Sequence, residues 1–214
     1  MSRQILVSQA CFGPVQYFVH LEKAGKATIE KHSNYQRQTY RNRYRISGAN
    51  GPLTLSIPVE KGKALKVKDS KVKIAYHSNW QANHWRSIVS AYNSSPFFQF
   101  YRDDIEPFFS QKYTYLFDFN LESTRLLCEL LGIETEIVVS DDFQKNPADD
   151  VLDLREVIHP KKNFRKMDAT FIPVPYKQVF DERHGFIPNL SILDLLFNKG
   201  PEALLVLNSG IKKG

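Results

Sequence analysis

Hydrophobic and polar positions follow one kind of pattern near the N-terminus and another after residue 77. An apolar run at 4–10 predicts a buried strand, helical spacing at 13–25 predicts a helix, and 27–32 predicts a second strand. Pro14 suits the first helical position and Gly25 suits the C-cap. A strand, a helix and a strand in this order are typical of a parallel βαβ unit.

Two alternating stretches follow this opening unit. Residues 40–47 and 53–59 alternate with period 2, and the Asn-Gly pair at 50–51 is a strong turn signal, so we expect a β-hairpin. Another alternating run at 71–77 predicts a further strand. The lysine-rich piece at 60–70 is expected to be a mobile loop between them.

Helical spacing dominates the rest of the chain. The expected elements are a helix at 78–92, a helix at 94–109 with a second start near Asp104, a helix at 120–133 capped by Asn120 and ended by Gly132, a strand at 135–140, a helix at 149–158 and two short helices within 189–210.

These elements predict an α/β to α+β fold. The strand-rich first third has a βαβ start and a basic hairpin, and the helical remainder packs on the sheet. The length of 214 residues favours a single domain over 1–214, with a strand-rich part at 1–77 and a mainly helical part at 78–214.

Positive charge is concentrated in one region. The whole chain carries a net +6, but residues 31–73 hold eleven Lys or Arg against two acids, a local net of +9. Such a region favours an anionic partner such as a phosphate-bearing small molecule or a nucleic acid.

Several classes of protein lack support in the sequence. No run approaches 18 apolar residues and no signal peptide is recognised, so we expect no membrane span and a cytoplasmic location. The two cysteines, Cys11 and Cys128, are expected to be buried thiols. The Gly-rich phosphate-binding motifs are missing, and no histidines pair at i, i+4, so no cofactor and no metal site are predicted.

An arginine set lies in the stretch NYQRQTYRNRYRI at 34–46. A regular strand would place Arg41, Arg43 and Arg45 on one face and Asn42 on the other. Guanidinium groups bind phosphate and carboxylate in a bidentate manner, but arginine stems also cover solvated sheet faces. A turn near 42–43 would let Asn42 and Arg43 reach one ligand. The interleaved tyrosines could also stack single-stranded bases, although tyrosine is an ordinary strand residue.

Two further groups could contribute chemistry. His84 lies one helical turn after Trp80, with Asn83 beside it, and could act as a general base or simply pack in the core. The loop after the first strand should lie at the carboxyl edge of the sheet, where ligands bind. Gln9, Tyr17 and His20 could face that crevice, and the helix N-terminus near Pro14 would favour anions.

These segments resemble the WbqC-like protein family of bacteria. The N-terminal strand followed by CFGPVQYFVHL is similar to a family motif at Gln9, Phe12, Pro14, Tyr17 and Phe18. The block YRNRYRISGANGPLTLSIPV is similar at Arg41, Asn42, Arg43, Ile46, Ile57, Pro58 and Val59. The block NWQANHWRSIVSAYNSSPFF at 79–98 is similar to a third motif. Ala10, Gln16 and Tyr44 depart from the family pattern.

The resemblance implies a transferase of acyl or aminoacyl groups, for example glycyl, in surface-polysaccharide (O-antigen) biosynthesis. Its acceptor would be a nucleotide-linked or phosphate-bearing sugar. Arg41, Arg43 and Arg45 would then hold the phosphates, and Asn42 would orient the sugar. His84 or His20 would take the proton of the attacking amine.

Two alternatives remain open at this point. One is a non-catalytic module that binds anions or nucleic acid through residues 31–73, whose affinity would fall steeply with salt. The other is an α/β protein whose function lies in an oligomer interface. An anionic small molecule, either a nucleotide sugar or an acyl donor, is the expected partner, nucleic acid is less favoured, and the oligomeric state is open.

Overall fold

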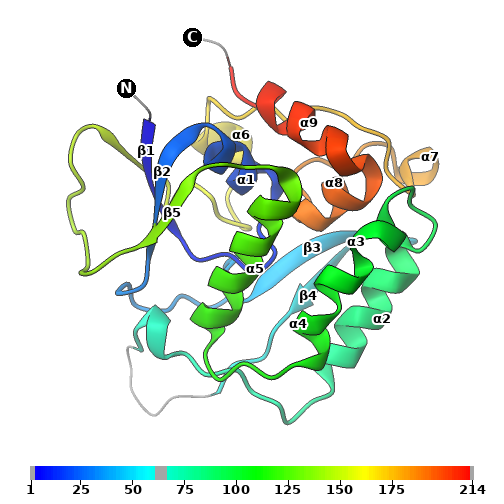
Figure 1. Ribbon diagram of the computed structural model, residues 1–214, viewed down its shortest axis with the longest axis horizontal. Coiled ribbons are helices and arrows are strands. Elements are labelled where there is room, and N and C mark those ends of the chain that lie inside the picture. Colours follow the sequence, from blue (N-terminus) through cyan, green and yellow to red (C-terminus); the bar gives the residue numbers. More distant parts are fainter. Residues whose placement is uncertain (1–2, 61–66, 213–214) are drawn as a thin grey trace.

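A parallel sheet of four strands forms one side of the molecule (Figure 1). The structure is a computed structural model that describes residues 3–60 and 67–212. The strand order is β5-β2-β1-β6. Their bounds are Arg3–Ser8 for β1, Ala24–Glu30 for β2, Glu136–Val139 for β5 and Val151–Asp153 for β6. The mixed α/β class expected from the sequence is confirmed.

The predicted βαβ opening is also confirmed. Strands β1 and β2 pair in parallel, and helix α1 (Val15–Glu22) connects them. Every residue from 15 to 21 is buried, because α1 packs against β2, α8 and α9. The predicted helix ends were wrong. Pro14 is the extended N-cap residue rather than the first helical residue, and Gly25 lies in β2.

The predicted hairpin consists of β3 (Arg43–Gly48) and β4 (Gly51–Ser56). A two-residue turn at 49–50 joins the strands, and Gly51 adopts φ +104°, which favours glycine. The hairpin begins three residues later than expected, because residues 37–42 form turns. Inside β3 the parity is as predicted: Tyr44 and Ile46 are buried, while Arg43 and Arg45 are half-buried.

The strand predicted at 71–77 is absent from the described residues. A single 3-10 turn, η1 (Asp69–Lys71), is followed by isolated bridges from Lys73 to Tyr115 and from Ile74 to Val59. The alternating pattern instead reflects the burial of Val72 and Ile74 beneath other segments. Residues 61–66 of the predicted mobile loop lie outside the described residues.

Helices make up most of the second part. They are α2 (Trp80–Tyr92), α3 (Phe98–Ile105), α4 (Pro107–Ser110), α5 (Leu116–Leu131), α6 (Phe164–Met167), α7 (Asp181–His184), α8 (Ile192–Lys199), the 3-10 turn η2 (Gly200–Glu202) and α9 (Ala203–Ser209). Gly132 ends α5 in the left-handed conformation, as predicted. Asn120 was predicted to cap this helix, but α5 begins four residues earlier and Asn120 is a buried interior residue.

The helix predicted at 149–158 was wrong. Residues 151–153 form the edge strand β6, which pairs in parallel with β1. The open side of β1 offers backbone hydrogen bonds that outweigh the local helical spacing. The remaining residues of that segment form a turn, in which the amide N–H groups of Val157 and Ile158 donate to the carbonyl of Leu154.

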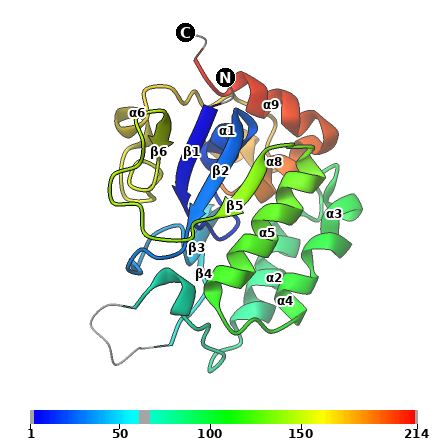
Figure 2. The same ribbon diagram turned by 60° about the vertical axis from the view of Figure 1, so that its left-hand side comes forward.

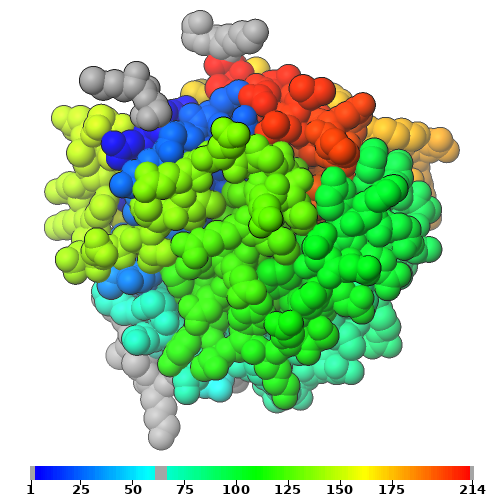
Figure 3. Space-filling model, in the orientation of Figure 1, coloured from blue at the N-terminus to red at the C-terminus, as the bar shows by residue number. Residues whose placement is uncertain are grey.

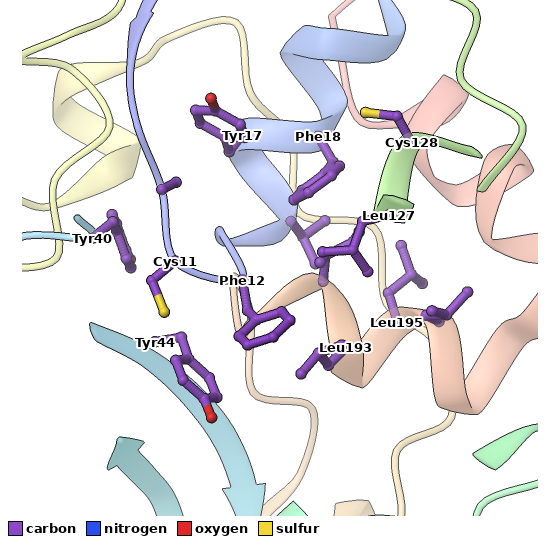
Figure 4. Packing of buried hydrophobic residues seen from close by; sticks show 14 of the residues in the cluster. Cys11, Phe12, Tyr17, Phe18, Tyr40, Tyr44, Leu127, Cys128, Leu193 and Leu195 are labelled. Carbon is purple, nitrogen blue, oxygen red and sulfur yellow. The ribbon is translucent and has the colours of Figure 1, made fainter. Parts of the chain in front are cut away.

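One buried cluster takes residues from both parts of the chain. Phe12 lies near its centre, and its ring packs 5.2 Å from that of Tyr44 and 5.6 Å from that of Phe119. Figure 4 shows Phe12 between Tyr44 of the hairpin and Leu193 of α8. The expectation of a single domain over 1–214 stays a prediction. No helix in residues 3–60 and 67–212 is long and apolar enough to cross a bilayer.

Candidate functional site

The sheet topology defines one crevice. The chain runs from β1 to β2 and then to β5 on one side, and it returns to β6 on the other side of β1. The direction of the connections reverses between β1 and β6. Such a reversal opens a crevice at the carboxyl ends of these strands, where α/β folds bind ligands. These ends point toward the hairpin β3–β4 in Figure 2. The carboxyl edge is therefore the expected position of a ligand site.

A cavity of about 320 Å³ lies at this edge, and we call it the edge cavity. Its lining comes from the ends of β2 and β6, the turn before β3, the turn at η1 and the segment after β5. The lining residues are His32, Ser33, Asn34, Gln36, Arg41, Lys68, Phe143, Asp153, Arg155 and Glu156. Figure 3 shows the segment after β5 lying beside the N-terminal strands.

Arg41 is the one residue of the arginine set that lines the edge cavity, and it is nearly buried at 4% exposure. Its Nε donates to Asp69 Oδ2 at 2.8 Å, and its Nη2 donates to Ser8 Oγ at 3.0 Å. Its Nη1 makes no hydrogen bond with a described residue and so can donate to a ligand. Burial raises the pKa of the Asp69 carboxyl, and the adjacent Arg41 guanidinium opposes that shift.

A buried amide network holds this arginine from behind. Asn120 Nδ2 donates to the Arg41 carbonyl at 2.8 Å and to Gln9 Oε1 at 2.7 Å. The network therefore links α5 and the end of β1 to the Arg41–Asp69 pair.

Arg155 supplies a second guanidinium to the edge cavity. It is fork-bonded to Asp153, with Nε–Oδ1 at 2.9 Å and Nη2–Oδ2 at 2.7 Å, and its Nη1 lies 3.5 Å from Glu30 Oε2. Burial alone would raise the pKa of Asp153, but the hydrogen bonds from Arg155 bring it below its ordinary value. Glu30 is fully buried and accepts from the His32 amide at 2.7 Å and from Ser140 Oγ at 3.0 Å. Glu30 therefore ties the ends of β2, β5 and β6 together.

The rim of the edge cavity carries a lysine and an exposed phenylalanine. Lys68 is exposed, and its Nζ donates to the His32 carbonyl at 2.7 Å. Phe143 is 49% exposed, and its ring centre lies 6.0 Å from Lys68 Nζ and 5.5 Å from the Arg155 guanidinium carbon. Both distances fall within the range of a cation–π contact.

A narrow second cavity lies between the ends of β1 and β6, and we call it the slot. It has room for about one water at roughly 10 Å³, and Arg41 lines both the slot and the edge cavity. Gln9, Tyr17 and His159 also line the slot. The Tyr17 hydroxyl is buried without a hydrogen-bond partner among the described residues, and it points away from the aromatic cluster in Figure 4. The slot thus brings Gln9 and Tyr17 of the expected crevice together with Arg41 of the arginine set, and a binding role for these residues stays a prediction.

His20 lies elsewhere on α1. It is 1% exposed, and its Nε2 lies 2.6 Å from Asp168 Oδ2, which also accepts from Gln16. Burial alone would raise the pKa of Asp168, but the hydrogen bonds from His20 and its neighbours hold it well below its ordinary value. His20 lines neither the edge cavity nor the slot.

The N-terminus of α1 does not offer free donors for an anion among the described residues. The Val15 amide donates to the Leu190 carbonyl at 2.9 Å, and the Gln16 amide donates to Asn189 Oδ1 at 2.9 Å. These contacts satisfy the groups that a helix N-terminus usually leaves for ligands. The anion site expected near Pro14 is therefore already occupied by the protein.

His84 is a buried residue of α2. Its Nδ1 lies 3.1 Å from the Tyr44 hydroxyl, and its ring packs 5.1 Å from that of Trp80. Burial lowers its pKa to about 4, so its imidazole is neutral at pH 7. His84 lines neither cavity at the carboxyl edge. Its neighbour Asn83 is exposed and accepts a hydrogen bond from Arg86.

The other predicted residues of the hairpin are not brought to the edge cavity. Arg43 and Arg45 lie in β3 and do not line it. Asn42 is half-buried, and its Nδ2 donates to the Ile57 carbonyl at 3.0 Å, which fastens the turn before β3 to the chain after β4. A turn does precede β3, as Asn42 and Arg43 would need to reach one ligand. It places Arg41 at the edge cavity instead of those two residues.

Sequence reasoning missed most residues of the edge cavity. Lys68, Asp153, Arg155 and Phe143 come from segments for which a loop, a helix or no element was predicted. A parallel edge strand at 151–153 would have placed Arg155 at the carboxyl edge, because the residues after such strands gather there. No three His, Cys, Asp or Glu side chains of the described residues lie close enough to hold a metal ion.

Comparison with known proteins identifies the family. The sequence pattern of the WbqC-like protein family matches residues 9–170 and 161–206, so the chain belongs to this family. It is 26% identical over 227 residues to the uncharacterized protein Rv1507c of Mycobacterium tuberculosis, covering 94% of this chain and 96% of that protein. No solved structure matches the chain significantly.

Proposed function

We propose that this protein is a transferase that moves an acyl or aminoacyl group onto a phosphate-bearing sugar bound in the edge cavity. The observation that carries the proposal is the edge cavity of about 320 Å³, which Arg41, Lys68 and Arg155 line at the carboxyl edge of the sheet. Guanidinium and ammonium groups in such a crevice are suited to phosphate oxygens. The chain belongs to the WbqC-like family, and the role in surface-polysaccharide biosynthesis that this resemblance implies favours a sugar as the acceptor.

The chemistry of such a transfer needs a base. The amine nitrogen of the sugar forms a bond to the carbonyl carbon of an activated acyl donor, such as a thioester. The bond from that carbon to the thiolate leaving group breaks, and the amine proton passes to the base. One positioned base contributes roughly 10²–10⁴-fold.

His32 is the base that the contacts favour. It lines the edge cavity, and its buried Nε2 makes no hydrogen bond with a described residue. Its backbone amide is fixed by Glu30, which restricts where the imidazole can lie. The catalytic roles predicted from sequence for His20 and His84 stay predictions.

Calorimetric titration with sugar 1-phosphates and nucleotide sugars tests the binding part. Lys68→Gln removes an exposed cation from the rim and should weaken binding about tenfold or more, because a charge-assisted hydrogen bond contributes roughly 1.5–3 kcal/mol. Lys71→Gln is the matched control, since Lys71 is an exposed lysine of the same turn that does not line the cavity. If the wild type binds none of these compounds, the proposal fails.

Mass spectrometry tests the transfer part. The titrated compounds include amino sugars, and those that bind are incubated with acyl thioesters and the protein. A mass increase of one acyl group that the protein accelerates supports transfer. His32→Gln should abolish this acceleration while leaving binding of the sugar intact. An unchanged rate in His32→Gln would remove His32 as the base.

A further inference from the structure

Phe143 is an exposed aromatic residue at a charged site. It is 49% exposed, follows β5 at the carboxyl edge, and lines the edge cavity together with Arg41, Lys68 and Arg155. The other strongly exposed large apolar residues of the described chain, such as Phe100 and Leu205, do not line this cavity. A single exposed aromatic is ordinary, but one on the rim of a ligand-sized cavity is a candidate contact.

Two cations that line the edge cavity, Lys68 and Arg155, also contact the Phe143 ring. Lys68 Nζ and the Arg155 guanidinium carbon lie 6.0 and 5.5 Å from the centre of the Phe143 ring. Arg155 is itself fixed by its fork to Asp153, so the ring lies against a guanidinium of defined orientation. The Phe143 ring therefore lies in contact with two cations, Lys68 and Arg155, that also line the edge cavity.

We propose that Phe143 is a stacking platform for a nucleobase, and that the ligand of the edge cavity is a nucleotide-linked sugar rather than a simple sugar phosphate. A nucleotide carries a flat aromatic ring one ribose away from its phosphates, which matches this arrangement. Stacking of a base on an aromatic side chain contributes roughly 1–3 kcal/mol and tolerates any base. The inference rests on the proposed function, because it assumes that the edge cavity binds phosphate.

Calorimetric titration of uridine and adenosine diphosphates, compared with pyrophosphate and glucose 1-phosphate, tests the inference. Phe143→Leu should weaken binding of both nucleotides about tenfold, within the roughly 5- to 150-fold span of base stacking, and leave pyrophosphate and glucose 1-phosphate unchanged. Phe143→Trp should bind the nucleotides as well as the wild type or more tightly. Phe100→Leu is the matched control, because Phe100 is 75% exposed on α3 and should change no affinity.

The outcomes separate this inference from the proposed function. If the wild type binds pyrophosphate or glucose 1-phosphate and Phe143→Leu binds nucleotides unchanged, the stacking role is refuted and phosphate binding stands. The stacking role is equally refuted if Phe143→Leu only lowers the melting temperature, since the ring would then merely cover the Arg155 ion pairs. If the wild type binds none of the four compounds, the proposed function fails as well.

Discussion

The buried pair of Arg41 and Asp69 should stabilise the fold as a unit. The side chains are 4% and 0% exposed, and the Nε–Oδ2 distance is 2.8 Å, so solvent does not screen the pair. An exposed pair of this kind contributes only about 0–1 kcal/mol. Removing one partner of a buried pair instead costs about 3–5 kcal/mol, because the remaining charge is left without compensation. We therefore expect Arg41→Met to lower the free energy of unfolding by about 3–5 kcal/mol.

A double-mutant cycle measures the coupling. Asp69→Asn leaves Arg41 charged and should also destabilise the protein, whereas Arg41→Met/Asp69→Asn leaves no buried charge at this point. The double variant should therefore cost less than the sum of the two single variants by about 1–3 kcal/mol. The free energies come from urea unfolding at pH 7, with the slope m checked for constancy.

Two results would refute this reasoning about the pair. Additive single costs would mean that Arg41 and Asp69 do not interact in solution. A cost below about 1 kcal/mol for Arg41→Met would mean that the guanidinium is solvated, as in a surface pair. Either result would also mean that Arg41 is not held in its buried position at the edge cavity, which would weaken the case for that site.

Three further changes test other parts of the structure. The pKa of His84 is lowered from 6.5 to about 4, so the folded state disfavours its charged form; stability is full above pH 6.5 and should fall by about 3 kcal/mol as the pH drops to 4. Urea unfolding of His84→Gln should lose this component, and His77→Gln should keep it. Tyr17→Phe removes a hydroxyl with no partner among the described residues, so its urea midpoint should stay equal or rise, and a loss above about 1 kcal/mol would reveal a hidden bond. Gly200→Ala places a Cβ 2.5 Å from the Phe97 ring at φ +51° and should cost more than about 3 kcal/mol, whereas a Cβ at Gly132 meets only an ordinary contact with Leu204 at 3.8 Å and should cost only about 1–2 kcal/mol by thermal unfolding.

The local parts of the fold could be predicted from the sequence. The βαβ opening, the hairpin and the C-terminal end of α5 at Gly132 each depend on signals within a few residues of one another. A glycine in a left-handed position acts locally, and alternating apolar residues joined by a tight turn need only each other to form a hairpin.

The errors fall where distant segments decide the conformation. Residues 149–158 have helical spacing, but 151–153 pair as a strand with the open side of β1, which lies almost 150 residues earlier in the chain. The alternation at 71–77 predicts a strand, but only isolated bridges form, because the partners at Val59 and Tyr115 each pair with a single residue. Asn120 has a side chain that is typical of a helix cap, but it lies inside α5 and donates hydrogen bonds to Gln9 Oε1 and to the Arg41 carbonyl.

The candidate site could be predicted only in part for the same reason. Gln9 and Tyr17 were selected at the junction of the first strand and its helix, Arg41 was selected for its guanidinium group, and the three line the slot. The acids and cations that complete the edge cavity lie directly before η1 (Lys68), at the end of β6 (Asp153) and directly after it (Arg155 and Glu156). Their relevance depends on which strands lie next to β1, and a single sequence does not give that order.

The charges at the edge cavity favour a small ligand over a nucleic acid. The local net of +9 suggests a polyanion, but Lys61, Lys63 and Lys66 of that count lie outside the described residues. Of the cations at the cavity, Arg41 is paired with Asp69, and Arg155 is paired with Asp153 and Glu30. These acids cancel much of the long-range field while keeping the guanidinium groups in fixed directions. Such an arrangement suits the one or two phosphates of the proposed ligand, whereas a nucleic-acid surface with about six to ten phosphate contacts loses its affinity steeply with salt.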